Sequence, residues 1–244
     1  MSKLRAGVIG VGYLGAFHAE KYQRIPGVRL VGLADTNFDR VKEISDRYNV
    51  EAHKDYKTLL PNVDILSIVV PSGRHYEVAK ECLSRGIHCL VEKPLTENVN
   101  EANELVALAK DKQVVLQVGH LERFNPVIRK VSHLLKSPHK IKTRRFSRHQ
   151  PRGTDTDVVL DLMIHDLDLV LSLSNSEVVD VQATGAAVIT DFIDIANAMV
   201  FFKNGLVAEL GASRVSTETV RDVEVHCKSG KYFLNFLTHV AKFF

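Results

Sequence analysis

Short apolar runs alternate with longer amphipathic stretches over the first 120 residues of the chain. The apolar runs are continuous rather than broken by a polar residue at every second position, which is typical of strands covered on both faces. They occupy residues 4–10, 28–34, 64–70, 87–91 and 114–118. The stretches between them have helical periodicity and occupy residues 14–24, 38–48, 76–85 and 99–110. Strands and helices in this order predict an α/β fold with a doubly wound parallel sheet.

The pattern changes near residue 120, which predicts two domains, 1–120 and 121–244. Helices are expected from Pro126 to about Leu135, because proline fits a first helical turn, and over residues 159–173. Asn204-Gly205 has the residues of a tight hairpin turn. Strands are expected at residues 141–148, 180–188, 195–202, 206–215 and 221–227. The second half thus predicts an α+β domain with an open, largely antiparallel sheet, and residues 231–244 fit either a docking helix or a shortened chain.

Composition and charge narrow the class of protein. The chain carries 32 Lys and Arg against 29 Asp and Glu, a balance too even to indicate nucleic-acid binding. Three cysteines without CxxC spacing favour a reducing compartment. No apolar run approaches the roughly 20 residues of a membrane span, and the N-terminus has no apolar signal region. We therefore expect a cytoplasmic protein with no membrane and no nucleic-acid partner.

A glycine-rich turn directly follows the first predicted strand and has the pattern G-x-G-x-x-G. Between a strand and a helix, this pattern indicates a Rossmann dinucleotide site. Gly10 permits the tight turn, Gly12 lets the backbone approach a pyrophosphate, and Gly15 lets the helix pack closely on the strand. Tyr13 and Leu14 lie at the start of the helix, whose N–H groups would face the phosphates.

Asp35 ends the second predicted strand, twenty residues after Gly15. An acidic residue at this position accepts hydrogen bonds from the adenosine ribose hydroxyls. Because a carboxylate would repel a 2′-phosphate, the sequence favours NAD, and NADP is the less favoured alternative that nearby Arg40 keeps open. Asp35 also has a simpler interpretation as the cap of the following helix.

Two further segments carry side chains suited to catalysis. Glu92-Lys93-Pro94 follows a predicted strand at the sheet edge where ligands bind, and a cis bond before the proline would tighten the turn. Farther along, Asp161 and His165 are four residues apart on a predicted helix, and Asp168 continues their face. A carboxylate beside an imidazole orients the ring and raises its basicity. Taken singly, a strand-end lysine is often solvated and a helical histidine often belongs to a core. Two ligands are too few for a metal site, so we expect none.

Together these motifs resemble the glucose–fructose oxidoreductase, inositol dehydrogenase and rhizopine-catabolism family, abbreviated Gfo/Idh/MocA. The resemblance implies an N-terminal Rossmann domain, and a C-terminal domain that binds substrate and assembles through its open sheet into a homodimer or homotetramer. It implies that Lys93 is catalytic and that Asp161 and His165 face a bound sugar or cyclitol. The residues that it implies beside the cofactor are Pro71, His75, Glu92 and Lys93. Family members are usually longer, so the second domain is expected to be shortened at its C-terminus.

A narrower resemblance is to the branch whose members oxidise the C3 hydroxyl of UDP-N-acetylglucosamine. Residues 118–126, 161–168, 190–191, 194–197 and 212–215 carry it. It implies hydride transfer to NAD, with Lys93 or His165 accepting the hydroxyl proton, and substrate contacts by Arg123 and Arg145. A basic set could meet the diphosphate or be merely solvated, namely Lys142, Arg144, Arg145, Arg148 and Arg152. The alternatives are a dehydrogenase of inositol or a free sugar and, from another class, a non-catalytic NAD-binding sensor.

Overall fold

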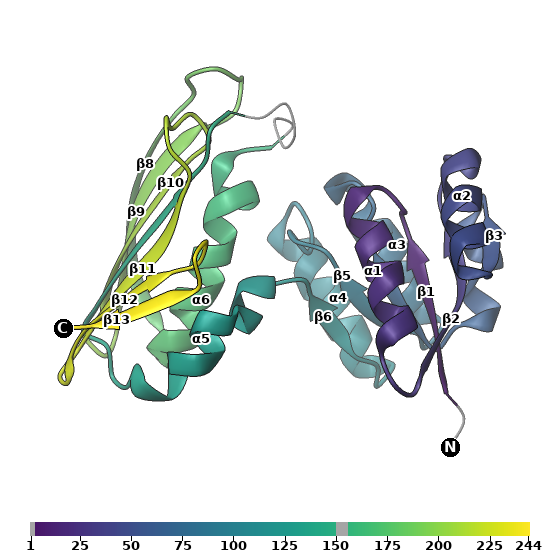
Figure 1. Ribbon diagram of the computed structural model, residues 1–244, viewed down its shortest axis with the longest axis horizontal. Coiled ribbons are helices and arrows are strands. Elements are labelled where there is room, and N and C mark those ends of the chain that lie inside the picture. Colours follow the sequence, from purple (N-terminus) through teal and green to yellow (C-terminus); the bar gives the residue numbers. More distant parts are fainter. Residues whose placement is uncertain (1–2, 150–155) are drawn as a thin grey trace. The chain divides into compact units, whose positions relative to one another are not determined.

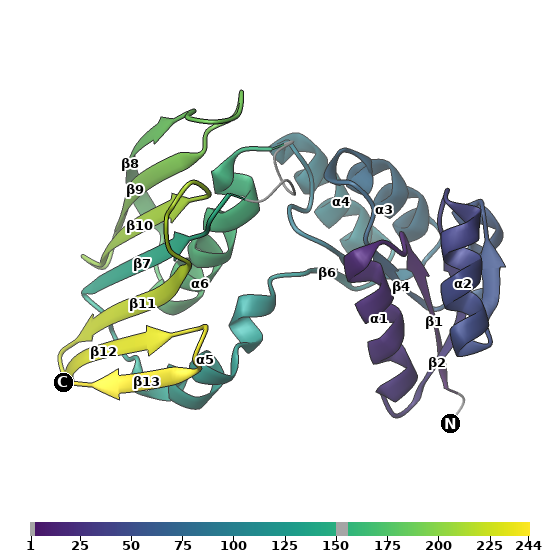
Figure 2. The same ribbon diagram turned by 45° about the horizontal axis from the view of Figure 1, so that its top comes forward.

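The computed structural model describes residues 3–149 and 156–244, and Figures 1 and 2 show two views of it. These residues form two compact units, which meet in the sequence between Gly119 and His120. No helix in the described part of the chain is long and apolar enough to cross a membrane.

The first unit contains, over its described residues, a six-stranded sheet in the order β3-β2-β1-β4-β5-β6. Its strands are β1 (Leu4–Ile9), β2 (Val28–Ala34), β3 (Glu51–His53), β4 (Ile65–Ile68), β5 (His88–Val91) and β6 (Leu116–Val118). Its helices are α1 (Tyr13–Arg24), α2 (Phe38–Tyr48), α3 (His75–Ser84) and α4 (Val99–Asp111). All neighbouring strands pair in parallel, so the predicted doubly wound α/β sheet is confirmed.

Helices cover both faces of this sheet, which explains why its strands are apolar on both sides. One apolar cluster packs α1 and α2 on β1 and β2 around Leu33 and Ile44. A second cluster packs α3 and α4 on β4 and β5 around Leu66 and Leu105. Figure 2 shows the two pairs of helices on opposite sides of the strands. The edge strand β3 was not predicted, because its three residues contain no apolar run.

The strand order brings the predicted cofactor residues to one edge of the sheet. β1 leads directly into Gly10, β2 into Asp35 and β5 into Glu92, while Pro71 lies three residues beyond β4. Because parallel strands all present their carboxyl ends at the same edge, segments far apart in the sequence meet there. This edge, at the point where β1 separates β2 from β4, is where an open α/β sheet binds its ligand.

The second unit has, over its described residues, a seven-stranded sheet in the order β13-β12-β11-β7-β10-β9-β8. Its strands are β7 (Lys140–Phe146), β8 (Val178–Ala186), β9 (Ile195–Phe202), β10 (Val207–Ser213), β11 (Val220–Cys227), β12 (Gly230–Asn235) and β13 (Val240–Phe243). β7 and β10 run parallel, and the other neighbouring pairs are antiparallel. Figure 1 shows α5 (Pro126–Val131) and α6 (Ile164–Ser174) on one face and no helix on the other. The prediction of an open, largely antiparallel sheet is confirmed.

The end of the chain corrects one expectation. The last residues form the strands β12 and β13 rather than a docking helix. The backbone turns back after β11, where Cys227 pairs with Gly230, which has a φ of +140°. The buried side chains of Tyr232, Leu234 and Phe236 then alternate with more exposed ones. This period of two is the signature of a half-buried strand, and a helix could not bury all three.

The helix predicted over residues 159–173 also differs from expectation at its start. Its first residues form η6 (Val159–Met163), a π-turn with i→i+5 hydrogen bonds, and the regular helix α6 begins only at Ile164. Apolar periodicity marks a helix, yet it does not distinguish a π-turn from an α-turn over five residues.

Candidate functional site

The glycine-rich turn between β1 and α1 has no room for a side chain at two of its glycines. Gly10 has a φ of +87°, and a Cβ there would lie 2.3 Å from the carbonyl oxygen of Val69. A Cβ at Gly15 would lie 1.9 Å from the carbonyl oxygen of Gly10. The absence of a side chain at Gly15 therefore allows the first turn of α1 to pack closely against the glycine-rich turn. At Gly12 nothing lies within 4 Å of a Cβ, which leaves the main chain open to a pyrophosphate. Other predicted cofactor residues are exposed at this edge, namely Tyr13, Leu14 and Pro71.

Asp35 is hydrogen-bonded to this turn. Its Oδ2 accepts the N–H of Val11 at 2.7 Å, and its Oδ1 accepts the N–H of Asn37 at 2.9 Å. Each carboxylate oxygen retains a second lone pair for a ribose hydroxyl. The side chain that caps α2 belongs to Asn37, which removes the simpler interpretation of Asp35 as the cap. Arg40 is paired with Glu43 at 2.7 Å. The open glycine turn and the acidic side chain fit NAD.

Two alanine variants should separate cofactor binding from folding. Gly12→Ala fills only open space in the protein, so we expect an unchanged melting temperature and a loss of NAD affinity of about 10- to 100-fold. A charge-assisted hydrogen bond to phosphate contributes about 1.5–3 kcal/mol, which corresponds to that range. Gly15→Ala should lower both properties, because its Cβ meets main chain. Calorimetric titration with NAD and thermal melts measure the two effects, and normal NAD affinity in Gly12→Ala would exclude this turn from the site.

The segment Glu92-Lys93-Pro94 forms a tight turn after β5, and its Lys93–Pro94 bond is cis, as expected. Lys93 itself is half-buried. His75, only 1% exposed, lies with its ring nitrogens 2.7 Å from the carbonyl oxygen of Pro94 and 2.9 Å from that of Val70. His75 therefore joins the segments that follow β4 and β5. Its ring is buried and has a main-chain carbonyl oxygen at each nitrogen, so its effect on a cofactor at this edge would be indirect.

The sequence reasoning missed two residues that contact Glu92. The Nε2 atom of His18, on α1, lies 3.1 Å from the Glu92 Oε1 atom, and a Cβ at Gly119 would lie 2.8 Å from the same oxygen. Burial raises the pKa of Glu92, but hydrogen bonds from His18 and the Lys93 N–H hold it below its usual value. A signal existed in α1, where His18 and Tyr22 occupy inward helical positions that normally form an apolar stripe.

Asp161 and His165 lie where η6 passes into α6, and both side chains are half-buried. The α-helical spacing that predicted a shared face does not apply to Asp161, because it lies in the wider π-turn. Such turns are frequent at functional sites. Among the described residues, no three His, Cys, Asp or Glu side chains are grouped as metal ligands.

Asp168 is engaged elsewhere, although the sequence placed it on the same face. It is buried, and its carboxylate accepts two hydrogen bonds of 2.6 Å from the guanidinium of Arg123. Hydrogen bonding to Asp168 raises the pKa of Arg123, whose side chain is half exposed. Arg123, a predicted substrate residue, is thereby fixed in a planar two-point pair.

Arg145 is buried beneath the sheet rather than displayed to a ligand. It is 3% exposed, and its guanidinium donates to Asp166 at 2.8 and 3.1 Å and to Glu122 at 3.0 Å. Burial raises the pKa of Asp166, while the charge and hydrogen bonds of Arg145 act in the opposite direction. The three side chains link β7, α6 and the segment that follows Gly119.

The predicted basic set does not form one patch, because successive side chains of a strand point to opposite faces. In β7, Lys142 and Arg144 are exposed on one face while Arg145 is buried on the other. Arg144 pairs with Asp222 at 2.6 Å. Arg148 lies beyond the strand and donates to the Thr217 carbonyl oxygen at 2.9 Å. Arg152 lies outside the described residues.

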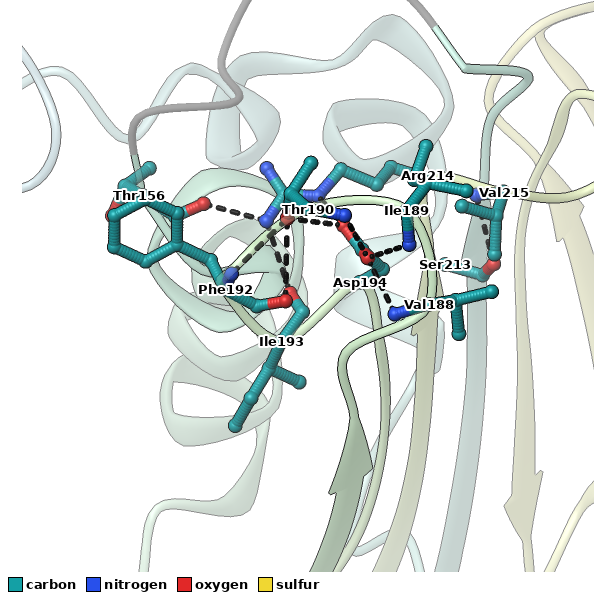
Figure 3. A network of polar contacts seen from close by, with 10 residues as sticks. All are labelled: Thr156, Val188, Ile189, Thr190, Phe192, Ile193, Asp194, Ser213, Arg214 and Val215. Atoms are coloured by element: carbon teal, nitrogen blue, oxygen red, sulfur yellow. Dashed lines mark hydrogen bonds and ion pairs between the residues drawn. The ribbon is translucent and has the colours of Figure 1, made fainter.

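A buried ion pair supports the segment that leads into η6 (Figure 3). Asp194 is fully buried, and its Oδ2 accepts the three successive N–H groups of residues 188–190 at 2.7–3.0 Å. Its Oδ1 accepts from Arg214 at 2.8 Å. Arg214 also donates to the carbonyl oxygen of Thr156 at 2.6 Å, and the Val158 N–H donates to that of Ile193 at 2.8 Å. The Asp194–Arg214 pair thus holds the residues just before the π-turn that carries Asp161.

Comparison with protein families identifies both units. Residues 4–120 match a family described as an oxidoreductase family with an NAD-binding Rossmann fold. Residues 128–233 match a family described as the GFO/IDH/MocA C-terminal domain.

Several characterised proteins are similar over most of the chain. UDP-N-acetylglucosamine 3-dehydrogenase of Acidithiobacillus ferrooxidans is 40% identical over 240 residues, which are 98% of this chain and 76% of that protein. A solved structure of UDP-N-acetylglucosamine 3-dehydrogenase GnnA from that organism superposes with a TM-score of 0.95 at 39% identity, covering 100% of this chain and 81% of the other. Myo-inositol 2-dehydrogenase of Thermotoga maritima is 28% identical over 94% of this chain and 75% of that protein.

Proposed function

Because this chain belongs to the Gfo/Idh/MocA family of NAD-binding oxidoreductases, we propose that it oxidises the C3 hydroxyl of a nucleotide sugar such as UDP-N-acetylglucosamine. The observation that carries this proposal is the 40% identity to a UDP-N-acetylglucosamine 3-dehydrogenase over 98% of the chain. The 28% identity to an inositol dehydrogenase makes inositol or a free sugar the second candidate.

The two units have different tasks in this proposal. Residues 1–120 bind NAD through the open main chain at Gly12 and the carboxylate of Asp35. Residues 121–244 bind the sugar through Asp161, His165 and the exposed part of Arg123. Arg145 contributes from within, because its pairs with Glu122 and Asp166 support the segments that carry the others.

The reaction is a reversible alcohol oxidation in which one hydride and one proton leave the substrate. NAD held at Gly12 and Asp35 would supply the hydride acceptor, so that the alcohol carbon would leave as a ketone and the cofactor as NADH. The hydroxyl proton passes to Lys93 or to His165, and Asp161 orients the imidazole. A positively charged Lys93 would also stabilise the developing alkoxide.

The uncovered face of the second sheet supports self-association. Residues of β7, β8, β9 and β10 line a shallow hollow of about 620 Å³, and β8 is exposed along its whole length. Phe146 and Met199 are apolar side chains among those that line it. A homodimer or homotetramer would cover them, and a monomer in sedimentation velocity would contradict this proposal.

All three cysteines are buried free thiols, which supports a cytoplasmic location that cell fractionation can test.

The proposed substrate is tested by following NADH formation with NAD and UDP-N-acetylglucosamine. Matched reactions contain inositol, glucose or free N-acetylglucosamine, and a further pair replaces NAD by NADP. We expect turnover with the nucleotide sugar and NAD, and a lower rate with NADP. Turnover with inositol or glucose alone would replace the proposal by the second candidate. Absence of turnover with every substrate would contradict both.

A further inference from the structure

A chain of buried polar side chains lies behind the Glu92-Lys93-Pro94 turn. The hydroxyl of Tyr22 lies 2.8 Å from the Oγ atom of Ser67, and that atom lies 3.0 Å from the Nδ1 atom of His18. The other ring nitrogen of His18 contacts Glu92 at 3.1 Å. Ser67 is fully buried within β4, and Glu92 is 7% exposed. Polar groups at such depth are expected to have a defined arrangement of donors and acceptors.

With a neutral His18 ring, the chemistry of the four groups gives this chain one direction. An ionised carboxylate can only accept, so the Nε2 atom of His18 carries the proton and donates it to Glu92. The Nδ1 atom of a neutral ring then accepts from the Ser67 hydroxyl. Ser67 in turn accepts from the Tyr22 hydroxyl. Every donor has an acceptor, so the ring of His18 is held at both nitrogens and its orientation is fixed.

Glu92 connects the fixed ring of His18 to the main chain of Lys93. The main-chain N–H of Lys93 donates to the Glu92 carboxylate, in addition to the contact from His18. The carboxylate also packs against the main chain at Gly119, where a Cβ would lie 2.8 Å from its Oε1 atom. His18 is on α1, which begins in the glycine turn. The hydrogen bonds thus connect the NAD-binding helix to the main chain of Lys93.

We propose that His18 is a positioning residue for hydride transfer, which fixes the Lys93 turn relative to the cofactor-binding helix through Glu92. This inference rests on the proposed function, in which Lys93 acts on the substrate. His18 does not touch the substrate in this proposal. It determines where the lysine lies when NAD occupies the turn at the start of α1, and a displacement of about 1 Å at a reacting group can lower the rate about 100-fold.

The test compares His18→Leu with His18→Gln. Leucine removes both hydrogen bonds, whereas the glutamine amide can place an N–H near the Nε2 position and donate to Glu92. We expect His18→Leu to lower kcat by about 10- to 100-fold, with the KM for the sugar and the Kd for NAD changed by less than about threefold. His18→Gln should regain most of kcat. Gly119→Ala serves as a second variant, because its Cβ would displace the Glu92 carboxylate and should lower kcat in the same way.

A second measurement does not depend on turnover. The Lys93 amide proton should move upfield in the ¹H–¹⁵N spectrum of His18→Leu, because its acceptor is no longer held, and stay near its wild-type position in His18→Gln. Unchanged kcat and an unchanged Lys93 amide in His18→Leu would overturn the inference, as would equal losses of kcat in the two variants. If the wild-type protein oxidised no sugar, the proposed function would fail, while the amide shift would still decide whether His18 positions Lys93.

Discussion

Replacing Lys93 with methionine should lower turnover by about 1000-fold or more while leaving NAD binding intact. Methionine keeps most of the length of the side chain, but it can neither accept a proton nor carry a charge. Proton transfer by a positioned side chain typically contributes about 10²- to 10⁴-fold, and electrostatic stabilisation of an alkoxide contributes a similar factor. Initial rates of NADH formation and calorimetric titration with NAD measure the two properties on the same preparation.

Matched variants show which role Lys93 has. Lys93→Arg keeps the positive charge but cannot serve as a base, because a guanidinium is not deprotonated in proteins. Partial activity in Lys93→Arg, together with an inactive His165→Asn, would assign the proton to His165. An inactive Lys93→Arg beside a partly active His165→Asn would assign it to Lys93. Full activity of Lys93→Met would remove the lysine from the mechanism.

The Rossmann half could be predicted from the sequence because its signals are local. A strand buried on both faces must be continuously apolar. A turn in which a Cβ would lie 2.3 Å from another residue's carbonyl oxygen must have glycine there, as at Gly10. The position of Asp35 at the end of β2 follows from the same strand pattern. Because parallel strands present their carboxyl ends at one edge of the sheet, the glycine-rich turn and Asp35 lie close together whatever the side chains around them.

The residues that sequence reasoning missed depend on contacts between distant segments. His18 and Glu92 are 74 residues apart, and only the parallel pairing of β1, β4 and β5 brings α1 next to the turn after β5. Arg144 and Arg145 are adjacent arginines that residue type alone cannot distinguish. The alternation of side chains along the strand exposes Arg144 and buries Arg145 against Asp166. A basic run in a sequence therefore does not reveal which of its members reach solvent, unless the strand register is known.

Breaking the buried Asp194–Arg214 pair should strongly destabilise the second unit. Asp194→Asn leaves the buried Arg214 without its counter-charge and turns an amide NH₂ toward N–H donors that need an acceptor. Removing one partner of a buried ion pair is strongly destabilising. We therefore expect the melting temperature of this unit to fall by about 10 °C at neutral pH, measured by calorimetry. Asp191→Asn is the matched control, because Asp191 is exposed in the same loop and should change little.

The pH dependence of this difference identifies its cause. Burial alone would raise the pKa of Asp194, but the N–H groups of residues 188–190 and the Thr190 hydroxyl hold it well below its usual value. A carboxyl with a lowered folded-state pKa stabilises the fold fully above its unfolded pKa of about 4, and this contribution is lost as the pH falls toward the folded-state value. The difference in melting temperature between wild type and Asp194→Asn should therefore be largest near neutral pH and shrink below about pH 4. A difference independent of pH would show that packing, not charge, stabilises this loop.

The same variant also tests whether the pair matters for the substrate. Arg214 donates to Thr156 and Ile193 accepts from Val158, so loosening this network frees the residues that lead into the turn of Asp161. NAD is assigned to the first unit, while the hydrogen bonds of Asp194 join residues of the second unit. At a temperature where Asp194→Asn is folded, the KM for the sugar should rise several-fold while the Kd for NAD stays at the wild-type value. An equal loss of sugar and NAD binding would instead indicate general unfolding. The network would then stabilise the fold without positioning the residues that bind the sugar.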